Sequence, residues 1–164
     1  MSKNYELISF RTPDELAAAA AKAWLDEIEL ANRMKASHDV ALSGGRITQK
    51  FLASFVEQSK SRKISFNTLN FFWVDERCVP PTDPESNFKI ANDILFAPLK
   101  ISEKQIHRLR GEDVPANAAK QAEAGIRSIV GSNAQGQPVL DLIFLGLGED
   151  GHIASLAPDE PEAM

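Results

Sequence analysis

The sequence predicts an α/β fold in which helices cover both faces of a mainly parallel sheet. Two nearly continuous apolar runs, "LNFFWV" at residues 69–74 and "VLDLIFLGL" at residues 139–147, have the composition of parallel strands that are covered on both sides. Segments with the periodicity or the capping signals of helices alternate with strand-like segments along the chain. Such alternation is typical of parallel sheets, because a helical crossover connects each strand to the next.

Length and composition narrow the range of functions. At 164 residues the chain has the length of one compact domain, and no linker or repeat divides residues 1–164. The 23 acidic and 18 basic residues give a formal net charge of −5 without a block of Lys and Arg, so we expect no nucleic-acid partner. The apolar stretches are too short or too interrupted to span a bilayer and the N-terminus lacks a signal pattern, so we expect a cytoplasmic protein with no membrane partner. Cys78 is the single cysteine, which excludes an intramolecular disulfide and a cysteine metal cluster.

The first helix has clear boundary signals. Residues 5–10, "YELISF", alternate in polarity and predict a strand before it. In "TPDE" at residues 12–15, the threonine is an N-cap, the proline suits the first helical position and the glutamate completes a capping box. We therefore expect a helix from this point to about Lys35. The residues expected on its buried face are Leu16, Ala20, Ala23, Trp24, Ile28 and Ala31.

The later elements continue the alternation. "DVALSGG" at residues 39–45 predicts a short buried strand that ends in two glycines, and Thr48 is the expected N-cap of a second helix. The apolar face of that helix consists of Phe51, Leu52, Phe55 and Val56. The elements expected after it are a strand at 69–74, a helix from Ser86 or Asn87 to Leu95, a short strand at 105–109, a helix from about Ala116 to Val130 and a last strand at 139–147.

Three loops concentrate the unusual residues of the chain. In an open parallel sheet, ligands bind in the crevice beyond the carboxyl ends of the strands. Applied to the predicted strands, this rule selects residues 43–46, residues 75–77 and residues 146–152. The coincidence of topology and composition points to a ligand site that these loops form together.

The glycine pair after the first buried strand is compatible with an anion site. Gly44 and Gly45 allow a tight turn and a close approach of the backbone to a ligand, and the next helix begins with free N–H groups. An ordinary turn between a strand and a helix has the same residues. Arg46 favours the anion site, because its guanidinium can grip phosphate oxygens in pairs.

Asp75, Glu76 and Arg77 place three charges at the end of an apolar strand. Arg77 is a candidate for binding a substrate phosphate, and Asp75 for service as an acid, a base or a hydroxyl acceptor. Charges at a strand end can equally be solvated without any function. The spacing alone leaves both interpretations open.

The third loop, "LGLGEDGHIASL" at residues 145–156, matches the glycine pattern of dinucleotide-binding turns. Such sites need an acidic residue about 20 positions further on to hold the ribose, whereas thirteen residues follow Gly151. We therefore disfavour a nucleotide site. His152 suits the role of a general base, since an imidazole can take a proton from water near neutral pH, and Asp150 can orient it. The plainer alternative is a histidine that caps the next helix.

Neither His38 nor His107 belongs to these loops, and we expect both to be structural. The number and spacing of the histidines indicate no metal site.

Two long motifs resemble one family of sugar-phosphate enzymes. "FFWVDERCVPPTDPESNFKIANDILF" and "DLIFLGLGEDGHIASL" are similar to 6-phosphogluconolactonases, whose relatives are the glucosamine-6-phosphate isomerases/deaminases, and the resemblance extends over residues 38–157. It implies a modified Rossmann-like sheet of the glucosamine-6-phosphate deaminase/ribose-5-phosphate isomerase type. It also implies a cofactor-free hydrolase that acts on a phosphorylated sugar lactone.

The resemblance also implies roles for individual residues. His152 falls on the histidine that activates the attacking water, and Asp150 on the acid two residues before it. Arg77 falls on a phosphate-contacting arginine, and the pair Gly44-Gly45 on the loop that cradles the phosphate. Asp75 matches the acid at the strand end that the deaminase relatives use as a base.

The chain departs from the family pattern in two places. The family loop Gly-Gly-Ser-Thr-Pro reads "GGRIT" at residues 44–48, so that Arg46 either binds the phosphate or fills its place. Family members also continue beyond the histidine motif, so we expect residues 1–164 to form one sugar-phosphate-binding domain that lacks the family's C-terminal portion.

Three functions are compatible with these residues. The leading one is hydrolysis of 6-phospho-D-glucono-1,5-lactone to 6-phosphogluconate in the oxidative pentose phosphate pathway, with His152 as the base. The second is a glucosamine-6-phosphate deaminase or isomerase that acts through Asp75. The third is a catalytically weak, shortened paralogue that binds sugar phosphates or a protein partner. Arg46 and the early end of the sequence after the histidine motif favour this third function.

Overall fold

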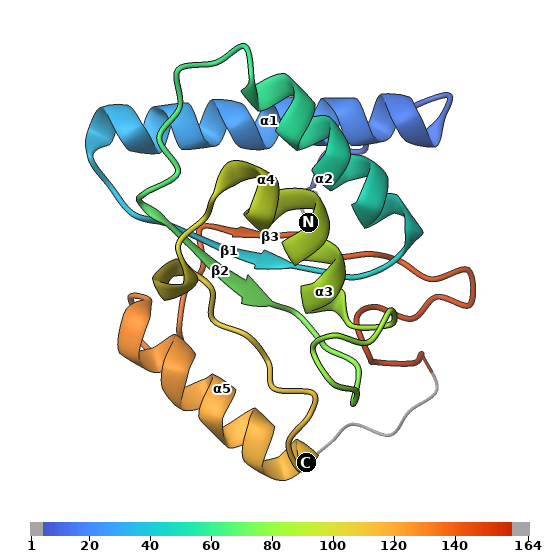
Figure 1. The fold of residues 1–164 in the computed structure, drawn as a ribbon, viewed down its shortest axis with the longest axis vertical. Coiled ribbons are helices and arrows are strands. Elements are labelled where there is room, and N and C mark those ends of the chain that lie inside the picture. Colours follow the sequence, from blue (N-terminus) through green and yellow to red (C-terminus); the bar gives the residue numbers. More distant parts are fainter. Residues whose placement is uncertain (1–4, 159–164) are drawn as a thin grey trace.

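A computed structural model describes residues 5–158, and these form a parallel sheet between two layers of helices (Figure 1). The described strands are β1 (His38–Leu42), β2 (Leu69–Trp73) and β3 (Leu142–Ile143), in the order β2-β1-β3. The register aligns His38 with Leu69 and Leu42 with Trp73, and β3 pairs with the other edge of β1. The α/β class with a parallel sheet, which the alternation of elements predicts, is confirmed.

The strands separate a large core from a small one. Val40 and Leu42 of β1 and Phe71 of β2 belong to the large core, which α1 (Pro13–Met34) and α2 (Arg46–Ser59) cover. Ala41 of β1 and Phe72 of β2 point to the opposite face. They pack with Val130 at the end of α5 (Pro115–Ile129). Because successive side chains of a strand face opposite sides, buried residues at every position require helices on both faces. Figure 1 shows α5 on the opposite side of the strands from α1 and α2.

The ends of α1 follow the local sequence. The Thr12 hydroxyl accepts a hydrogen bond from the Glu15 backbone N–H at 3.1 Å, and Lys35 ends the helix in the left-handed region with φ of 54°. Both boundaries confirm the prediction. The predicted buried face is wrong in part, because Leu16 is 41% exposed, and the buried residues are instead Ala17, Ala21, Trp24, Leu25, Ile28 and Ala31. Alanines are too small to fix the orientation of a helix, and Trp24, Leu25 and Ile28 determine it here.

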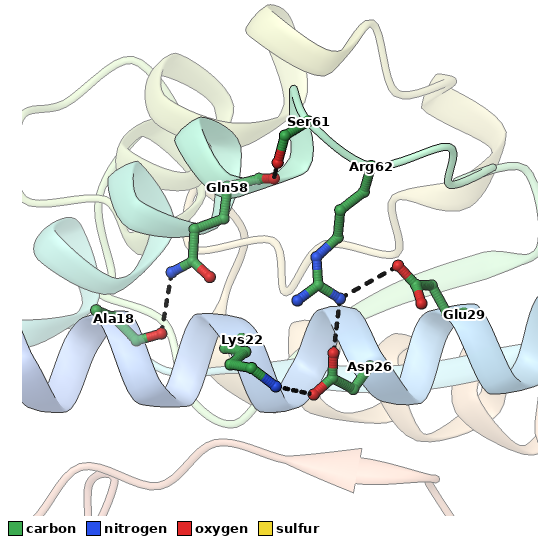
Figure 2. A network of polar contacts seen from close by, with 7 residues as sticks. All are labelled: Ala18, Lys22, Asp26, Glu29, Gln58, Ser61 and Arg62. Carbon is green, nitrogen blue, oxygen red and sulfur yellow. Dashed lines mark hydrogen bonds and ion pairs between the residues drawn. The ribbon is translucent and has the colours of Figure 1, made fainter.

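Polar contacts join the outer surfaces of α1 and α2 (Figure 2). Arg62, just after α2, donates through Nη1 to Asp26 at 2.7 Å and to Glu29 at 3.2 Å, and Lys22 also contacts Asp26 at 2.7 Å. Gln58 donates to the Ala18 carbonyl at 3.0 Å. The hydrogen bond from Lys22, followed by that from Arg62, lowers the pKa of Asp26. These contacts connect α1 to α2 and to the residues just after it.

Helix α2 begins earlier than predicted. Gly45 is its N-cap, whereas the Thr48 hydroxyl lies in the first turn and donates to the Gly44 carbonyl at 2.7 Å. A threonine can make such a backbone contact from inside a helix as well as from its cap. The expected apolar residues Phe51, Leu52 and Phe55 are buried.

The segment after β2 confirms the expected helix and extends it. Ser86 caps α3 (Asn87–Ala91), which continues through a π-helical turn (Asn92–Phe96) into α4 (Ala97–Leu99). The helix α5 also lies where the sequence predicts it. A single 3₁₀ turn (Glu103–Gln105) precedes the segment that runs beside β2.

Three strand predictions are corrected. Residues 5–10 form no strand, and Leu7 is 83% exposed. In residues 105–109 only Ile106 pairs, by one bridge to Phe71, and in residues 139–147 the ladder is limited to Leu142 and Ile143. A polarity pattern indicates that a segment can form a strand, but a strand also needs a neighbouring edge of matching length. Within residues 5–158, no helix combines the length and the apolar character needed to cross a membrane.

Candidate active site

A cleft of about 1340 Å³ lies beyond the carboxyl ends of the strands. Its walls come from the glycine turn after β1, the loop after β2, the residues around His152 and the start of α1. The residues predicted for the site all line it: Gly44, Gly45, Arg46, Asp75, Arg77, Asp150 and His152. The three loops that topology selects therefore meet in one place.

The glycine turn is shaped by close packing. A Cβ on Gly44 would lie 2.0 Å from Oδ1 of Asn87, and Gly45 has φ of +100°, which side chains rarely allow. Asn87 is buried and donates through Nδ2 to the Asp75 carbonyl at 3.1 Å. Asn87 thus joins the glycine turn to the end of β2.

The N-terminus of α2 faces the cleft without a side-chain cap. Its N-cap Gly45 has no acceptor to offer, and the first residues of the helix, Arg46 and Ile47, line the cleft. Free N–H groups and the positive end of the helix dipole favour an anion at such a position.

Arg46 contacts the histidine loop. Its Nη2 lies 3.2 Å from Oε1 of Glu149, and both side chains are more than nine-tenths exposed. An exposed ion pair of this kind contributes about 0–1 kcal/mol. A phosphate could therefore displace Glu149 from Arg46 at small cost.

The three charges after β2 have separate surroundings. The Glu76 carboxylate caps α3: Oε1 accepts from the Asn87 N–H at 2.7 Å, and Oε2 accepts from the Phe88 N–H at 2.9 Å and the Ser86 hydroxyl at 3.1 Å. Arg77 is exposed in the cleft, and its guanidinium has no hydrogen-bond or ionic partner among residues 5–158. Sequence reasoning treated the three charges as a group and missed the capping role of Glu76.

Asp75 contacts the histidine loop directly. Its Oδ2 accepts a hydrogen bond from the Ser155 hydroxyl at 3.1 Å, across a separation of eighty residues in the chain. Sequence reasoning missed this contact. The only available signal was the presence of both residues in loops at the carboxyl edge of the sheet.

Asp150 orients the imidazole of His152. Its Oδ1 lies 2.5 Å from Nδ1 of His152 and also accepts the His152 backbone N–H at 3.3 Å. The hydrogen bond with the imidazole lowers the pKa of the Asp150 carboxyl. An ionised carboxylate can only accept, so Nδ1 carries a hydrogen, and in the neutral imidazole this leaves the lone pair on Nε2, where it can accept a proton.

Close packing and backbone conformation explain the glycines at positions 148 and 151. A Cβ on Gly148 would lie 2.3 Å from two atoms of the imidazole, and Gly151 has φ of +88°. The Gly148 N–H donates to the His152 carbonyl at 2.8 Å, and the Gly151 N–H to the Gly148 carbonyl at 3.0 Å. The glycine spacing thus forms a compact turn that carries a histidine.

The other two histidines lie outside the cleft. His38 is buried and accepts a hydrogen bond from Nε1 of Trp24 at 3.3 Å. His107 stacks on Phe72 and lies 3.3 Å from Oδ1 of Asn70, and burial lowers its pKa. Within the described part of the chain, no group of three or more His, Cys, Asp or Glu side chains is arranged to hold a metal ion.

Comparison with known proteins identifies a family that matches most of the chain. The family model described as glucosamine-6-phosphate isomerases/6-phosphogluconolactonase matches residues 11–164. A 6-phosphogluconolactonase of Treponema pallidum is 39% identical over 75% of this chain and 50% of its own length. One of Streptomyces coelicolor is 32% identical over 98% of this chain and 64% of its own length. The chain therefore spans roughly half to two thirds of these curated relatives.

A solved structure shares the fold. The 6-phosphogluconolactonase from Trypanosoma cruzi superposes with a TM-score of 0.79 at 28% identity, over 93% of this chain and 62% of that protein. The likeness therefore concerns the fold of nearly the whole chain.

Proposed function

The chain belongs to the glucosamine-6-phosphate isomerase/6-phosphogluconolactonase family, and from this premise we propose that it hydrolyses 6-phospho-D-glucono-1,5-lactone to 6-phosphogluconate, a step of the oxidative pentose phosphate pathway. One observation carries the proposal. The Asp150–His152 pair, whose carboxylate and Nδ1 lie 2.5 Å apart, opens on the same cleft as Arg77 and the glycine turn. The names of the relatives support the same reaction.

The phosphate end of the substrate is assigned to the glycine turn. Gly44 and Gly45 let the backbone approach the phosphate, and the uncapped N-terminus of α2 supplies N–H donors. Arg77 has a guanidinium available for a paired contact with two phosphate oxygens. Arg46 can add a second such contact when it leaves Glu149.

The lactone end is assigned to His152. Nε2 of the imidazole takes a proton from a water molecule as the water oxygen attacks the lactone carbonyl carbon. The bond between that carbon and the ring oxygen then breaks, and the ring oxygen leaves as a hydroxyl after receiving the proton from the imidazolium. Asp150 holds Nδ1–H throughout and stabilises the charged ring.

The proposal is tested by following the loss of freshly generated lactone against its spontaneous hydrolysis. Wild type should exceed the background rate, and His152→Ala should fall to it, because the base is lost. His107→Gln is the matched control, since His107 lies outside the cleft, and it should retain activity.

Three other outcomes would contradict the proposal. A wild-type rate equal to background excludes the lactonase. Release of ammonia from glucosamine 6-phosphate, abolished by Asp75→Asn, would instead support a deaminase. Saturable binding of 6-phosphogluconate without turnover of the lactone would support a protein that only binds sugar phosphates.

A further inference from the structure

We propose that Ser155 is a positioning residue for His152, because its hydroxyl fastens the turn that carries the histidine to Asp75 at the end of β2. The inference rests on the proposed function for the effect on catalysis. The fastening itself rests on the structure, through the 3.1 Å contact between Ser155 Oγ and Asp75 Oδ2. Ser155 follows His152 by three residues in the same turn, so a displacement of Ser155 also displaces the backbone that carries the imidazole.

The two ends of this contact differ in how closely they are packed. Asp75 follows β2, whose residues Phe71 and Trp73 belong to the large core, and its carbonyl is held by the buried side chain of Asn87. Ser155 lies in an exposed turn at the edge of the cleft. The hydrogen bond therefore ties an exposed turn to the end of a core strand, and such support from a packed element is what a catalytic group needs to be positioned.

The turn around Ser155 has a backbone conformation that needs support. Ile153 and Leu156 exchange backbone hydrogen bonds of 3.1 and 3.0 Å, and Ala154 between them has φ of 55°. A residue with a Cβ is disfavoured in this left-handed region, and it persists where surrounding contacts hold it. The bond from Ser155 to Asp75 is such a contact.

A second contact of the same loop is a weaker anchor. Arg46 and Glu149 lie 3.2 Å apart, but their side chains are 93% and 94% exposed. Long, solvated side chains lose rotamer freedom when they pair, so such a bridge holds a loop less firmly than a short serine hydroxyl. Of these two contacts, the hydrogen bond from Ser155 to Asp75 is consequently the firmer anchor of the loop that carries His152.

The kinetic test compares Ser155→Ala with Ser155→Thr. The alanine variant should lower kcat by about 10-fold, because a small displacement of a catalytic group is costly. KM should stay unchanged, since the phosphate contacts are assigned to the glycine turn and Arg77. Threonine retains a hydroxyl and should restore most of kcat. The matched control is Ser128→Ala, which removes a hydroxyl that donates to the Gly125 carbonyl at 2.8 Å within α5.

A second readout does not depend on activity. The backbone N–H groups of Gly148, Gly151 and Ile153 donate hydrogen bonds within the turn. Their hydrogen exchange should accelerate several-fold in Ser155→Ala, and it should not change in Ser128→Ala.

The outcomes separate the positioning role from the proposed function. Unchanged kcat and unchanged exchange in Ser155→Ala would overturn the positioning role. An increase in KM with unchanged kcat would also overturn it, because it would assign Ser155 to substrate binding. If wild type is inactive and hydrogen exchange in the turn is nevertheless faster in Ser155→Ala, the lactonase proposal is contradicted. The same result supports the anchoring of the turn by the hydrogen bond between Ser155 and Asp75.

Discussion

Gly148 illustrates how the position of a single functional side chain depends on the absence of another. The imidazole of His152 occupies the space that a Cβ at residue 148 would need, at 2.3 Å from both Cε1 and Nδ1. Gly146, two residues earlier in the same motif, has open space at the corresponding point. The two glycines of "GLG" are therefore not equivalent, although a sequence pattern treats them alike.

This difference predicts the effects of two alanine substitutions. Gly148→Ala should displace the imidazole and lower kcat for lactone hydrolysis by about 10- to 100-fold, since misplacement of a catalytic group is costly. Gly146→Ala should leave kcat near the wild-type value. Steady-state kinetics of the two variants provide the measurement, and equal kcat values would show that the contact has no catalytic consequence.

His107 predicts a dependence of stability on pH. Burial lowers its pKa in the folded state, while the charge of Asp39 acts in the opposite direction. The folded protein then binds fewer protons at this site than the unfolded chain, so the stabilising contribution is complete above the ordinary histidine pKa of about 6.5 and is lost as the pH falls toward the lowered value. The test is urea unfolding at pH 7.5 and at pH 5, which lie about one pH unit or more above and below the ordinary histidine pKa. Between these two conditions, the free energy of unfolding should fall more in wild type than in His107→Gln. Parallel losses in both proteins would count against this assignment.

Helix ends differ in how far they follow from neighbouring residues. The cap of α1 joins Thr12 to Glu15, within one turn, and could be predicted from four letters of sequence. The start of α3 depends on Glu76, about ten residues away, across a loop whose path the sequence does not define. The absence of a strand at residues 5–10 has a similar cause, since pairing requires a neighbour that polarity alone cannot supply.

The capping of α3 by Glu76 predicts a loss of stability on substitution. Glu76→Ala should lower the free energy of unfolding by about 2 kcal/mol, because it leaves the first N–H groups of the helix without an acceptor. Glu85→Ala is the control, since Glu85 is exposed just before the helix and its carboxylate takes no part in the cap. Chemical denaturation of both variants tests the difference. A cost for Glu76→Ala no larger than that for Glu85→Ala would show that water replaces the carboxylate.

For the molecule as a whole, the sequence sufficed to predict the layers and the edge of the sheet at which the cleft lies. Both follow from the alternation of elements and from the common direction of parallel strands. The contacts inside the cleft could not be predicted. The bond between Asp75 and Ser155 joins residues eighty positions apart, and it depends on how two exposed loops settle against each other.

The edge of the sheet at β3 carries an exposed apolar row. Val139, Ile143, Leu145 and Leu147 have exposed fractions of 52%, 49%, 58% and 74%. Ile143 aligns with Ala41, which faces the small core, whereas Leu145 and Leu147 line the cleft. Several exposed apolar side chains in one short segment favour association between molecules.

The row predicts concentration-dependent self-association of residues 1–164. The sedimentation coefficient of wild type should rise with protein concentration, and the double substitution Leu145→Ser and Leu147→Ser should reduce the rise. Leu30→Ser is the control, because Leu30 is 50% exposed on α1, away from this edge. A wild-type sedimentation coefficient that stays constant with concentration would contradict the prediction.

Asn87 connects the two parts of the protein to which the ends of the proposed substrate are assigned. Its side chain packs on Gly44 and holds the Asp75 carbonyl, and the carboxylate of Asp75 holds Ser155 beside the histidine turn. A phosphate bound at the glycine turn would restrict the motion of these linked side chains. Binding energy gained far from the lactone carbonyl would then contribute to the alignment of His152. A substrate without its phosphate would then react slowly even at saturating concentration.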